Sequence, residues 1–446
     1  MSLTGTDFYL PDMTLLKGMS ASAKGGAATC EKILKDAGKP LALEDLAIVL
    51  NTILSHESES VVPIVMAAGQ RVRRDLFDNW VVPMAPIEVS NTCASDCLFC
   101  GWRVSNRAMK RLKMPVDLAM LQVEYLIEQG IYYIEFVSGD DISVVRNVMP
   151  ELIRETRKLL DARGVQGKIS FCTLALTENQ YAELKAAGAD NMIVWQETYD
   201  DEIFHSHIKG GPKAYGITDD WKLDRGGNGC EFRIQSQERA LRAGLEVGLG
   251  AMLGLNPDVT TEFLATVDHA RYLMTHYGGS RQHPVIIGMP IWNAITTRET
   301  DLRPAQLMDM NRIFPALSAL YLLALPDEAT WVFPNCRVPL PVQIEAAQVA
   351  GAFSSTEVKL GPGGYLPSLL QAKRARGEDT SELEGKIYTL LRETGSDLDE
   401  MRRLLDEREQ FLHHYHEHSR YAAAMDEAGL RLTPDSIVPV SSAESL

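Results

Sequence analysis

From Ile87 onward, short apolar runs alternate with longer amphipathic stretches along the chain. Runs such as IYYIEFVSG, KISFCTLA and HPVIIGMPI have the length and nearly continuous apolar character of buried parallel strands. The stretches between them, such as VMPELIRETRKLLDARG, place apolar residues along one face of a helix. About eight strand–helix units follow one another, and such units form parallel sheets. The pattern therefore predicts an α/β fold, a (β/α)8 barrel of the TIM type.

Helical patterns flank this repeating region on both sides. Three of them precede it, over residues 27–37, 43–55 and 61–77. The last part of the chain is also helical in pattern and rich in charged residues, which is typical of a solvated cover across one end of a barrel. We therefore predict three regions: a helical extension over 1–80, the barrel over 81–365 and a C-terminal helical region over 366–446.

The C-terminal region contains the tract FLHHYHEHS, with histidines at 413, 414, 416 and 418. On a helix, His414 and His418 would share a face. The tract lacks the H-E-x-x-H pattern of a metalloprotease. We interpret it as a solvated helix rather than a metal site.

Composition narrows the class of protein. Of the 446 residues, 45% are hydrophobic and 23% are charged, as in an ordinary globular protein. The formal net charge of -16 argues against a nucleic-acid partner, because a phosphate backbone attracts a basic surface. The sequence shows neither a signal-peptide pattern nor an apolar run of roughly 18 residues that would suit a membrane span. We expect a cytoplasmic protein that acts on small molecules.

The stretch SNTCASDCLFCGWR, residues 90–103, holds three of the seven cysteines. Cys93, Cys97 and Cys100 directly follow the first predicted strand, so we expect them at the C-terminal mouth of the barrel, where TIM-barrel sites lie. An odd number of scattered cysteines argues against a disulfide framework. Structural zinc takes four ligands, and a ferredoxin-type cluster takes four cysteines. Three thiolates instead suit a [4Fe–4S] cluster whose fourth iron is open to a substrate or cofactor.

The spacing C-x3-C-x2-C, with Phe99 before its last cysteine, resembles the signature of the radical S-adenosylmethionine (SAM) superfamily. The resemblance extends over roughly residues 45–370. It implies a [4Fe–4S] cluster on the three cysteines, SAM chelated by the open iron, and Phe99 beside the adenine. Reductive cleavage of SAM would then yield a 5′-deoxyadenosyl radical, which requires a reductant of the flavodoxin or ferredoxin type.

The same resemblance assigns SAM binding to two further strand ends and one arginine. The residues are Ser138, Gly139, Asp140, Gln196, Glu197 and Arg239. In EFVSGDD, the Ser-Gly-Asp run stands for the family's small-small-acid motif, whose backbone carbonyls hold the SAM ammonium. In VWQETYD, the resemblance places Gln196 or Glu197 on the SAM ribose, and it places Arg239 on the SAM carboxylate. The structural alternatives are a strand-to-loop turn, a backbone partner and a helix-surface charge.

The stretch FPNCRVPLPVQIEAAQVAGAFSS supplies the expected substrate residues. Arg337 follows the seventh strand and Ser354 ends the eighth, and an arginine fork with a hydroxyl suits a carboxylate. The pair resembles the amino-acid carboxylate site of the branch that includes the thiazole-synthase tyrosine lyase and 3-methyl-2-indolic acid synthase, a tryptophan lyase. The alternatives are a surface ion pair for Arg337 and a cap or turn for Ser354, while Cys336 is expected to be a packing residue.

Two stretches, residues 194–221 and 288–304, look closer to the tryptophan lyase and make L-tryptophan the first substrate hypothesis. By the resemblance, hydrogen abstraction from the amino group fragments the amino acid. Glu88 departs from that enzyme, where a tyrosine is expected. Alternation along PIEVS points Glu88 inward, toward a substrate donor, a cationic substrate or a barrel arginine. The alternatives are an L-tyrosine lyase, a radical SAM mutase, and an iron–sulfur electron-transfer protein.

Overall fold

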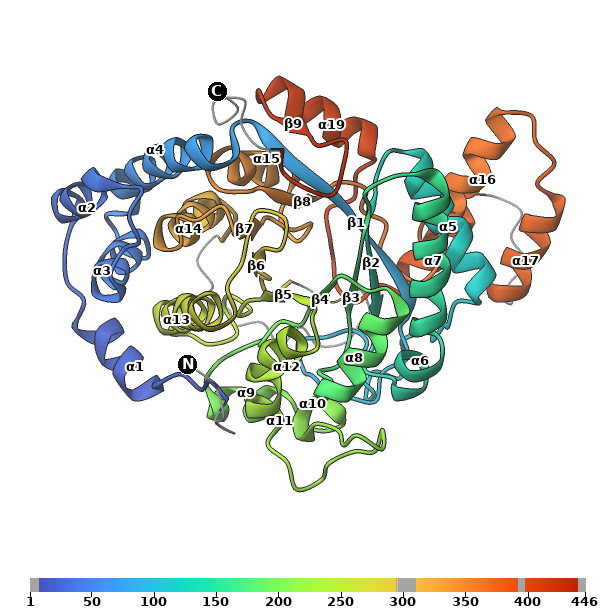
Figure 1. The fold of residues 1–446 in the computed structure, drawn as a ribbon, viewed down its shortest axis with the longest axis horizontal. Coiled ribbons are helices and arrows are strands. Elements are labelled where there is room, and N and C mark those ends of the chain that lie inside the picture. Colours follow the sequence, from blue (N-terminus) through green and yellow to red (C-terminus); the bar gives the residue numbers. More distant parts are fainter. Residues whose placement is uncertain (1–7, 294, 296–309, 392–397, 440–446) are drawn as a thin grey trace.

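The computed structural model describes residues 8–293, 295, 310–391 and 398–439. Eight parallel strands form one curled sheet in the order β7-β6-β5-β4-β3-β2-β1-β8 (Figure 1). The strands are β1 Trp80–Ser90, β2 Tyr133–Ser138, β3 Lys168–Cys172, β4 Asn191–Ile193, β5 Glu246–Leu249, β6 Val285–Gly288, β7 Thr330–Phe333 and β8 Phe353–Ser355. Between β7 and β8 the described residues form only the bridge Val332–Gly351. The predicted α/β barrel is confirmed, with a looser seam at that point.

Helices follow the strands and cover the outside of the sheet (Figure 1). The helices of the barrel region are α5 Val116–Glu128, α6 Ile142–Asn147, α7 Met149–Arg163, α8 Glu178–Ala187, α9 Asp201–His207, α10 Pro212–Tyr215, α11 Gly229–Ile234, α12 Ser236–Arg242, α13 Val259–Tyr277, α14 Met310–Ala324 and α15 Leu340–Val349. Several of these helices are capped at their N-terminus by side chains that accept hydrogen bonds from free backbone N–H groups. In α8, Thr177 and Gln180 form a capping box of this kind. None of the helices in the described residues is long and apolar enough to span a membrane.

The N-terminal extension packs along the outside of the barrel, at the left of Figure 1. Its elements are α1 Met13–Ser22, α2 Ala27–Ile33, the 3₁₀ helix η1 Leu34–Asp36, α3 Leu43–Ile53 and α4 Ser58–Phe77. Helix α4 crosses α14 so closely that a Cβ on Gly69 would lie 2.6 Å from the Cβ of Ala319. The extension is therefore packed tightly against the helices of the barrel.

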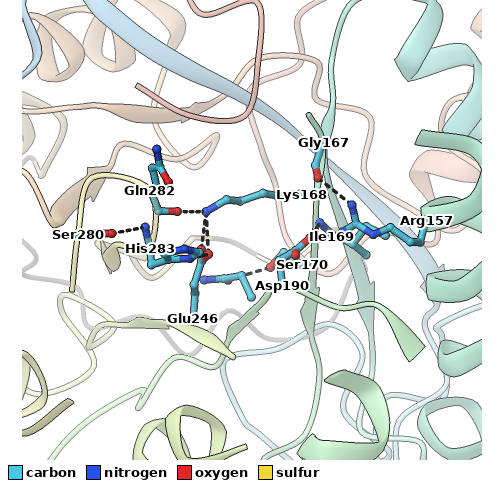
Figure 2. Close-up of polar contacts among 11 residues, drawn as sticks. Arg157, Gly167, Lys168, Ile169, Ser170, Asp190, Glu246, Ser280, Gln282 and His283 are labelled. Atoms are coloured by element: carbon cyan, nitrogen blue, oxygen red, sulfur yellow. Dashed lines mark hydrogen bonds and ion pairs between the residues drawn. The ribbon is translucent and has the colours of Figure 1, made fainter. Parts of the chain in front are cut away.

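Ionic contacts lie at the N-terminal end of the strands (Figure 2). Lys168, the first residue of β3, places its Nζ 2.7 and 2.8 Å from the carboxylate oxygens of Glu246, the first residue of β5. His283 Nδ1 lies 2.8 Å from the same carboxylate, and the backbone carbonyl of Gln282 accepts from Lys168. The Lys168 ammonium also approaches the Trp331 ring of β7, 5.9 Å from its centroid. Charged and aromatic side chains thus fill this end of the barrel, opposite the mouth.

The C-terminal region consists of α16 Leu366–Ala375, α17 Ser381–Leu391, α18 Leu398–Asp406, α19 His418–Glu427 and β9 Arg431–Leu432. β9 adds to the sheet by pairing with the start of β1, Trp80 with Arg431. The prediction of a solvated helix over FLHHYHEHS is wrong, because only its end lies in α19. His416 pairs with Val358, and His414 N donates to Cys336 O at 2.9 Å. These backbone contacts with the loops after β7 and β8 hold the tract extended and bury His416.

Candidate active site

A cavity opens at the C-terminal ends of the barrel strands. It contains about 1150 Å³ of atom-free space, the open mouth included, which is ample for small-molecule ligands. Of the residues expected from the sequence, those that line it are Glu88, Cys93, Cys97, Phe99, Cys100, Ser138, Gly139, Asp140, Glu197 and Arg337. Gln196, Arg239 and Ser354 are absent from this lining. The structure thus brings most of the candidate residues to one place.

The loop after β1 carries the three cysteine thiols into this cavity. Burial raises the pKa of all three thiols, that of Cys93 to about 12. Gln410 Nε2, from the C-terminal region, lies 3.1 Å from the Sγ of Cys100. Among the described residues, no three Cys, His, Asp or Glu side chains are arranged to hold a single metal ion. A cluster does not require such convergence, because each thiolate binds a different iron.

The Ser138-Gly139-Asp140 run lies directly against the cysteine loop. Gly139 N donates to Ser90 O at 2.9 Å, and Ala94 N donates to Asp140 O at 3.0 Å. A Cβ on Gly139 would lie 2.3 Å from Thr92 O, so the position admits only glycine without a shift of the backbone. Asp140 Oδ2 is buried and has no hydrogen-bond partner.

Asp141, the next residue, has a structural role. Its carboxylate accepts from Ser143 N at 2.9 Å at the start of α6 and from Thr92 Oγ1 at 2.6 Å. Lys113 Nζ lies 2.7 Å away. Burial alone would raise the pKa of Asp141, but hydrogen bonds from Lys113, Thr92 and Ser143 lower it to about 2. The carboxylate therefore ties the cysteine loop to the end of β2.

Glu197 lies in a buried group of charges beside the cysteines. Its Oε1 is 2.9 Å from Lys213 Nζ and 3.4 Å from Arg233 Nη2. Burial would raise the pKa of Glu197, but these two cations hold it below its usual range. The backbone of Glu197 has a φ of 68°, a strained conformation for a residue with a side chain. Lys213 also lies 6.0 Å from the Phe99 ring centroid, so the charged group and the aromatic side chain face the same space.

Gln196 and Arg239, expected in the site, bind other parts of the protein. Gln196 Oε1 accepts from Gly250 N at 2.8 Å. Arg239 Nε donates to Leu176 O at 2.8 Å, and its guanidinium stacks on Phe232 at 3.9 Å. The arginine from this stretch that reaches the cavity is Arg233 on α11. Arg239 instead lies on the next helix, α12, which begins after a turn at Gln235.

The expected substrate residues separate into one inside and one outside the cavity. Arg337 donates from Nη1 to Ile291 O at 2.9 Å and stacks on the Phe411 ring at 3.8 Å, with its guanidinium at the cavity wall. Ser354 instead donates to Pro334 O at 3.3 Å. Its neighbour Ser355 lines the cavity, because successive residues of β8 face opposite sides. Of these two serines, it is thus Ser355 and not the expected Ser354 that faces the cavity.

Glu88 points into the cavity as the alternation of β1 predicts. Its Oε2 accepts from Gly361 N at 2.5 Å, and no ion pair with a barrel arginine is present among the described residues. Burial raises the pKa of Glu88. A second acid that sequence reasoning missed, Glu135 on β2, also lines the cavity. The alternation argument applied to EFVSG could have found it, since Glu135 and Val137 share a face.

One wall of the cavity is aromatic. The rings of Trp195 and Phe333 stack with centroids 6.3 Å apart and planes 26° from parallel. A Cβ on Gly288 would lie 2.0 Å from the Trp195 ring, and a Cβ on Gly250 would lie 3.4 Å from it. These two glycines of the β5 and β6 region therefore make room for the indole. The wall could not be read from the sequence, because nothing in it shows that Trp195 turns toward β6.

Comparison with known proteins identifies the class. Residues 87–270 match the sequence profile of the Radical SAM superfamily. The match spans the cysteine loop, the Ser-Gly-Asp run and Glu197, all of which lie at the cavity. Residues 87–270 therefore form a radical SAM domain, and the enzymes of that superfamily use a [4Fe–4S] cluster and SAM.

Its relatives within that superfamily include named enzymes. The chain is 28% identical over 349 residues to 2-iminoacetate synthase of Escherichia coli (strain K12), covering 76% of this chain and 81% of that one. It is 27% identical over 231 residues to the [FeFe] hydrogenase maturase subunit HydE of Thermotoga maritima, covering 51% and 58%. The structure of the maturase HydG from Carboxydothermus hydrogenoformans superimposes with a TM-score of 0.71 and 19% identity, covering 94% of this chain and 84% of that chain. The last likeness shows a shared fold.

The residues present fit the two cofactors of the superfamily. Three free thiols line the same cavity and are available to hold a cluster. The Gly139 backbone lies against their loop, and the carboxylate of Asp140 has an unpartnered buried oxygen that a bound ammonium would satisfy. Part of the tryptophan-lyase-like stretch, 294 and 296–304, lies outside the described residues.

Proposed function

We propose that this protein is a radical SAM lyase that removes a hydrogen atom from the amino group of a free aromatic amino acid and then breaks a carbon–carbon bond next to Cα. The observation that carries the proposal is the joint lining of one cavity. The cysteine loop, the guanidinium of Arg337 and the aromatic wall of Trp195 and Phe333 surround the same space. One cavity can therefore hold an iron–sulfur cluster together with an amino acid, whose carboxylate would lie at Arg337 and whose aromatic ring would lie against the aromatic wall.

L-Tyrosine is the favoured substrate. The relative with 28% identity is named for its product, 2-iminoacetate. This two-carbon compound is what Cα–Cβ cleavage leaves of an amino acid, and with tyrosine the other product would be p-cresol. L-Tryptophan, cleaved at the bond to its carboxylate, is the second candidate, because the stretch over 194–221 resembles the tryptophan lyase. The aromatic wall suits either ring.

In this proposal Cys93, Cys97 and Cys100 hold the cluster, and the bound cluster and SAM together supply the 5′-deoxyadenosyl radical. Arg337 holds the substrate carboxylate through the donors that Ile291 leaves free. A fixed carboxylate presents the amino group toward the cofactor end of the cavity, and such positioning sets the rate of a radical transfer.

The cations beside the cysteines take part at the cofactor end. Lys213 and Arg233 neutralise Glu197 and provide positive charge near the cluster loop. We assign the carboxylate of SAM to this group in place of Arg239. The backbone of Ser138, Gly139 and Asp140 remains the proposed site for the SAM ammonium.

Anaerobic turnover tests the proposal. The reconstituted protein is incubated with SAM, dithionite and each aromatic amino acid, and 5′-deoxyadenosine and products are measured by mass spectrometry. We expect L-tyrosine to raise 5′-deoxyadenosine formation and to give p-cresol. The product 3-methyl-2-indolic acid from L-tryptophan would support the second candidate.

An Arg337→Lys variant tests the substrate carboxylate site, because it keeps the charge but loses the bidentate fork. We expect on the order of 10²-fold lower kcat/KM, with SAM binding unchanged. Deoxyadenosine formation that no aromatic amino acid alters would contradict the proposed substrate class.

A further inference from the structure

Glu135 lies deep in the cavity on β2. It pairs with Pro86 of β1, whereas Glu88 pairs with Val137, nearer to the mouth. Four residues separate Glu135 from Gly139, which touches the cysteine loop, and this corresponds to about 13 Å along the strand. Glu135 thus lies deeper in the barrel than the cofactor loop does.

Within the part of the chain that the structure describes, the carboxyl group of Glu135 has no hydrogen-bond or ionic partner. The residue is 7% exposed, and Oε1 is fully buried without a hydrogen bond. None of the described residues forms an ion pair with it. The other two glutamates of the cavity differ in this respect, since Glu88 binds Gly361 N and Glu197 binds Lys213.

An unpartnered carboxyl in such a place is unfavourable unless a ligand completes it. Pro86 pairs with this residue on β1, Val137 shares its face of β2, and Cys172 on β3 lies close enough for the two groups to interact electrostatically. None of these three side chains offers a strong hydrogen bond. Burial raises the pKa of Glu135 to about 8, so the group is mostly a neutral carboxylic acid at pH 7. A neutral carboxylic acid both donates and accepts hydrogen bonds. It therefore suits an uncharged polar atom better than a cation.

We infer that Glu135 binds the polar atom on the ring of the substrate, the phenol hydroxyl of tyrosine or the indole N–H of tryptophan, and excludes phenylalanine. This inference rests on the proposed function. The substrate would lie with its carboxylate at Arg337, its ring against Trp195 and Phe333, and its ring heteroatom at Glu135. A site built around such a hydrogen bond rejects the analogue that lacks it, because the buried acid is then left unpaired.

Binding to the reconstituted holoenzyme with SAM tests the inference. Isothermal titration under nitrogen measures the affinities for L-tyrosine, L-tryptophan and L-phenylalanine. We expect the wild type to bind tyrosine or tryptophan at least about 10-fold more tightly than phenylalanine. Glu135→Met should reduce that ratio to within about threefold, and Glu135→Gln should keep part of it.

Ser170→Ala is the matched control. Ser170 pairs with Glu135 in the sheet, but its hydroxyl donates to Asn191 at 3.0 Å and does not line the cavity. We expect the Ser170→Ala protein to prefer tyrosine or tryptophan over phenylalanine by the same ratio of affinities as the wild type. If the wild type and Glu135→Met show the same ratio of tyrosine affinity to phenylalanine affinity, the role of Glu135 is overturned but the proposed function is not. A wild type that binds none of the three amino acids would overturn the proposed function as well.

Stability without substrate gives an independent readout. If Glu135 serves the ligand, replacing it with an apolar residue of similar size removes a buried unpaired carboxyl. The Glu135→Met protein should then unfold at an equal or higher urea concentration than the wild type at pH 7. A clearly lower midpoint would show that the carboxyl supports the fold and would overturn the inference.

Discussion

Gln410 reaches the cysteine loop from 310 positions further along the chain. Its amide lies 3.1 Å from the Sγ of Cys100, and Gly101 N donates to the Gln410 backbone carbonyl at 2.9 Å. Hydrogen bonds to cluster sulfurs stabilise the more negative, reduced state and so raise the reduction potential. The C-terminal region thus has a direct way to tune the cluster that we propose on this loop.

We predict that Gln410→Leu lowers the reduction potential of the reconstituted cluster. A hydrogen bond of about 1 kcal/mol corresponds to about 40 mV for a one-electron couple. A redox titration followed by electron paramagnetic resonance measures the shift. The exposed Gln129→Leu is the control and should leave the potential unchanged, whereas an unchanged potential in Gln410→Leu would contradict the contact.

Single residues also show how far a pattern along the chain can be trusted. The cysteine spacing predicted the loop that the structure places at the mouth, and the alternation of β1 predicted the inward direction of Glu88. Its position at the end of the eighth strand did not settle the direction of Ser354, because the phase of the short β8 depends on its pairing with Pro83 and Met84 of β1. Periodicity shows that residues alternate, but the sheet decides which set faces inward.

At the scale of elements, the contact of Lys168 and Glu246 joins two strands at the bottom of the barrel (Figure 2). The side chains are 11% and 9% exposed, so little water is available to either charge. Burial raises the pKa of Glu246 even though Lys168 acts in the opposite direction. Removing one partner would leave the other charge buried and unpaired.

We predict that Lys168→Met lowers the free energy of unfolding by about 3–5 kcal/mol. Replacing both residues with methionine should cost less than Lys168→Met alone, because no unpaired charge remains. Urea unfolding of the single and double variants measures this difference. The exposed pair Lys158–Glu155 provides the control, and Lys158→Met should cost less than about 1 kcal/mol. A double variant as unstable as the sum of the single ones would contradict the coupling.

At the scale of the whole molecule, the start of the chain is fixed to the barrel by buried polar contacts. The Tyr9 hydroxyl donates to Asp268 at 2.6 Å, and its ring stacks on His269 of α13 with centroids 4.5 Å apart. His269 Nδ1 lies 3.0 Å from the Tyr199 hydroxyl. Burial lowers the pKa of His269 to about 3, so the folded protein keeps this imidazole neutral.

Acid should therefore weaken this attachment. The unfolded chain protonates the histidine near pH 6.5, so its contribution to stability is complete above that pH and is lost as the pH falls toward 3. We predict that the wild type loses about 2 kcal/mol relative to His269→Phe between about pH 7.5 and about pH 5. Urea unfolding at the two pH values measures the change. As a control, replacing the exposed His56 with phenylalanine should leave the change in unfolding free energy between the two pH values as in the wild type. A difference between the wild type and His269→Phe that does not change with pH would contradict the prediction.

The sequence by itself determined the barrel, its flanking helical regions, the cysteine loop and the radical SAM class. These features depend on local spacing: apolar periodicity sets strands and helices, and three cysteines within eight positions remain neighbours in any fold. The tertiary structure decided which of Arg233 and Arg239 reaches the cavity, that the amide of Gln410 contacts Cys100, and that no described residue binds the carboxyl group of Glu135. Those facts depend on how distant elements pack. They could not be predicted, because contacts between residues far apart in the chain produce no periodic pattern in the sequence.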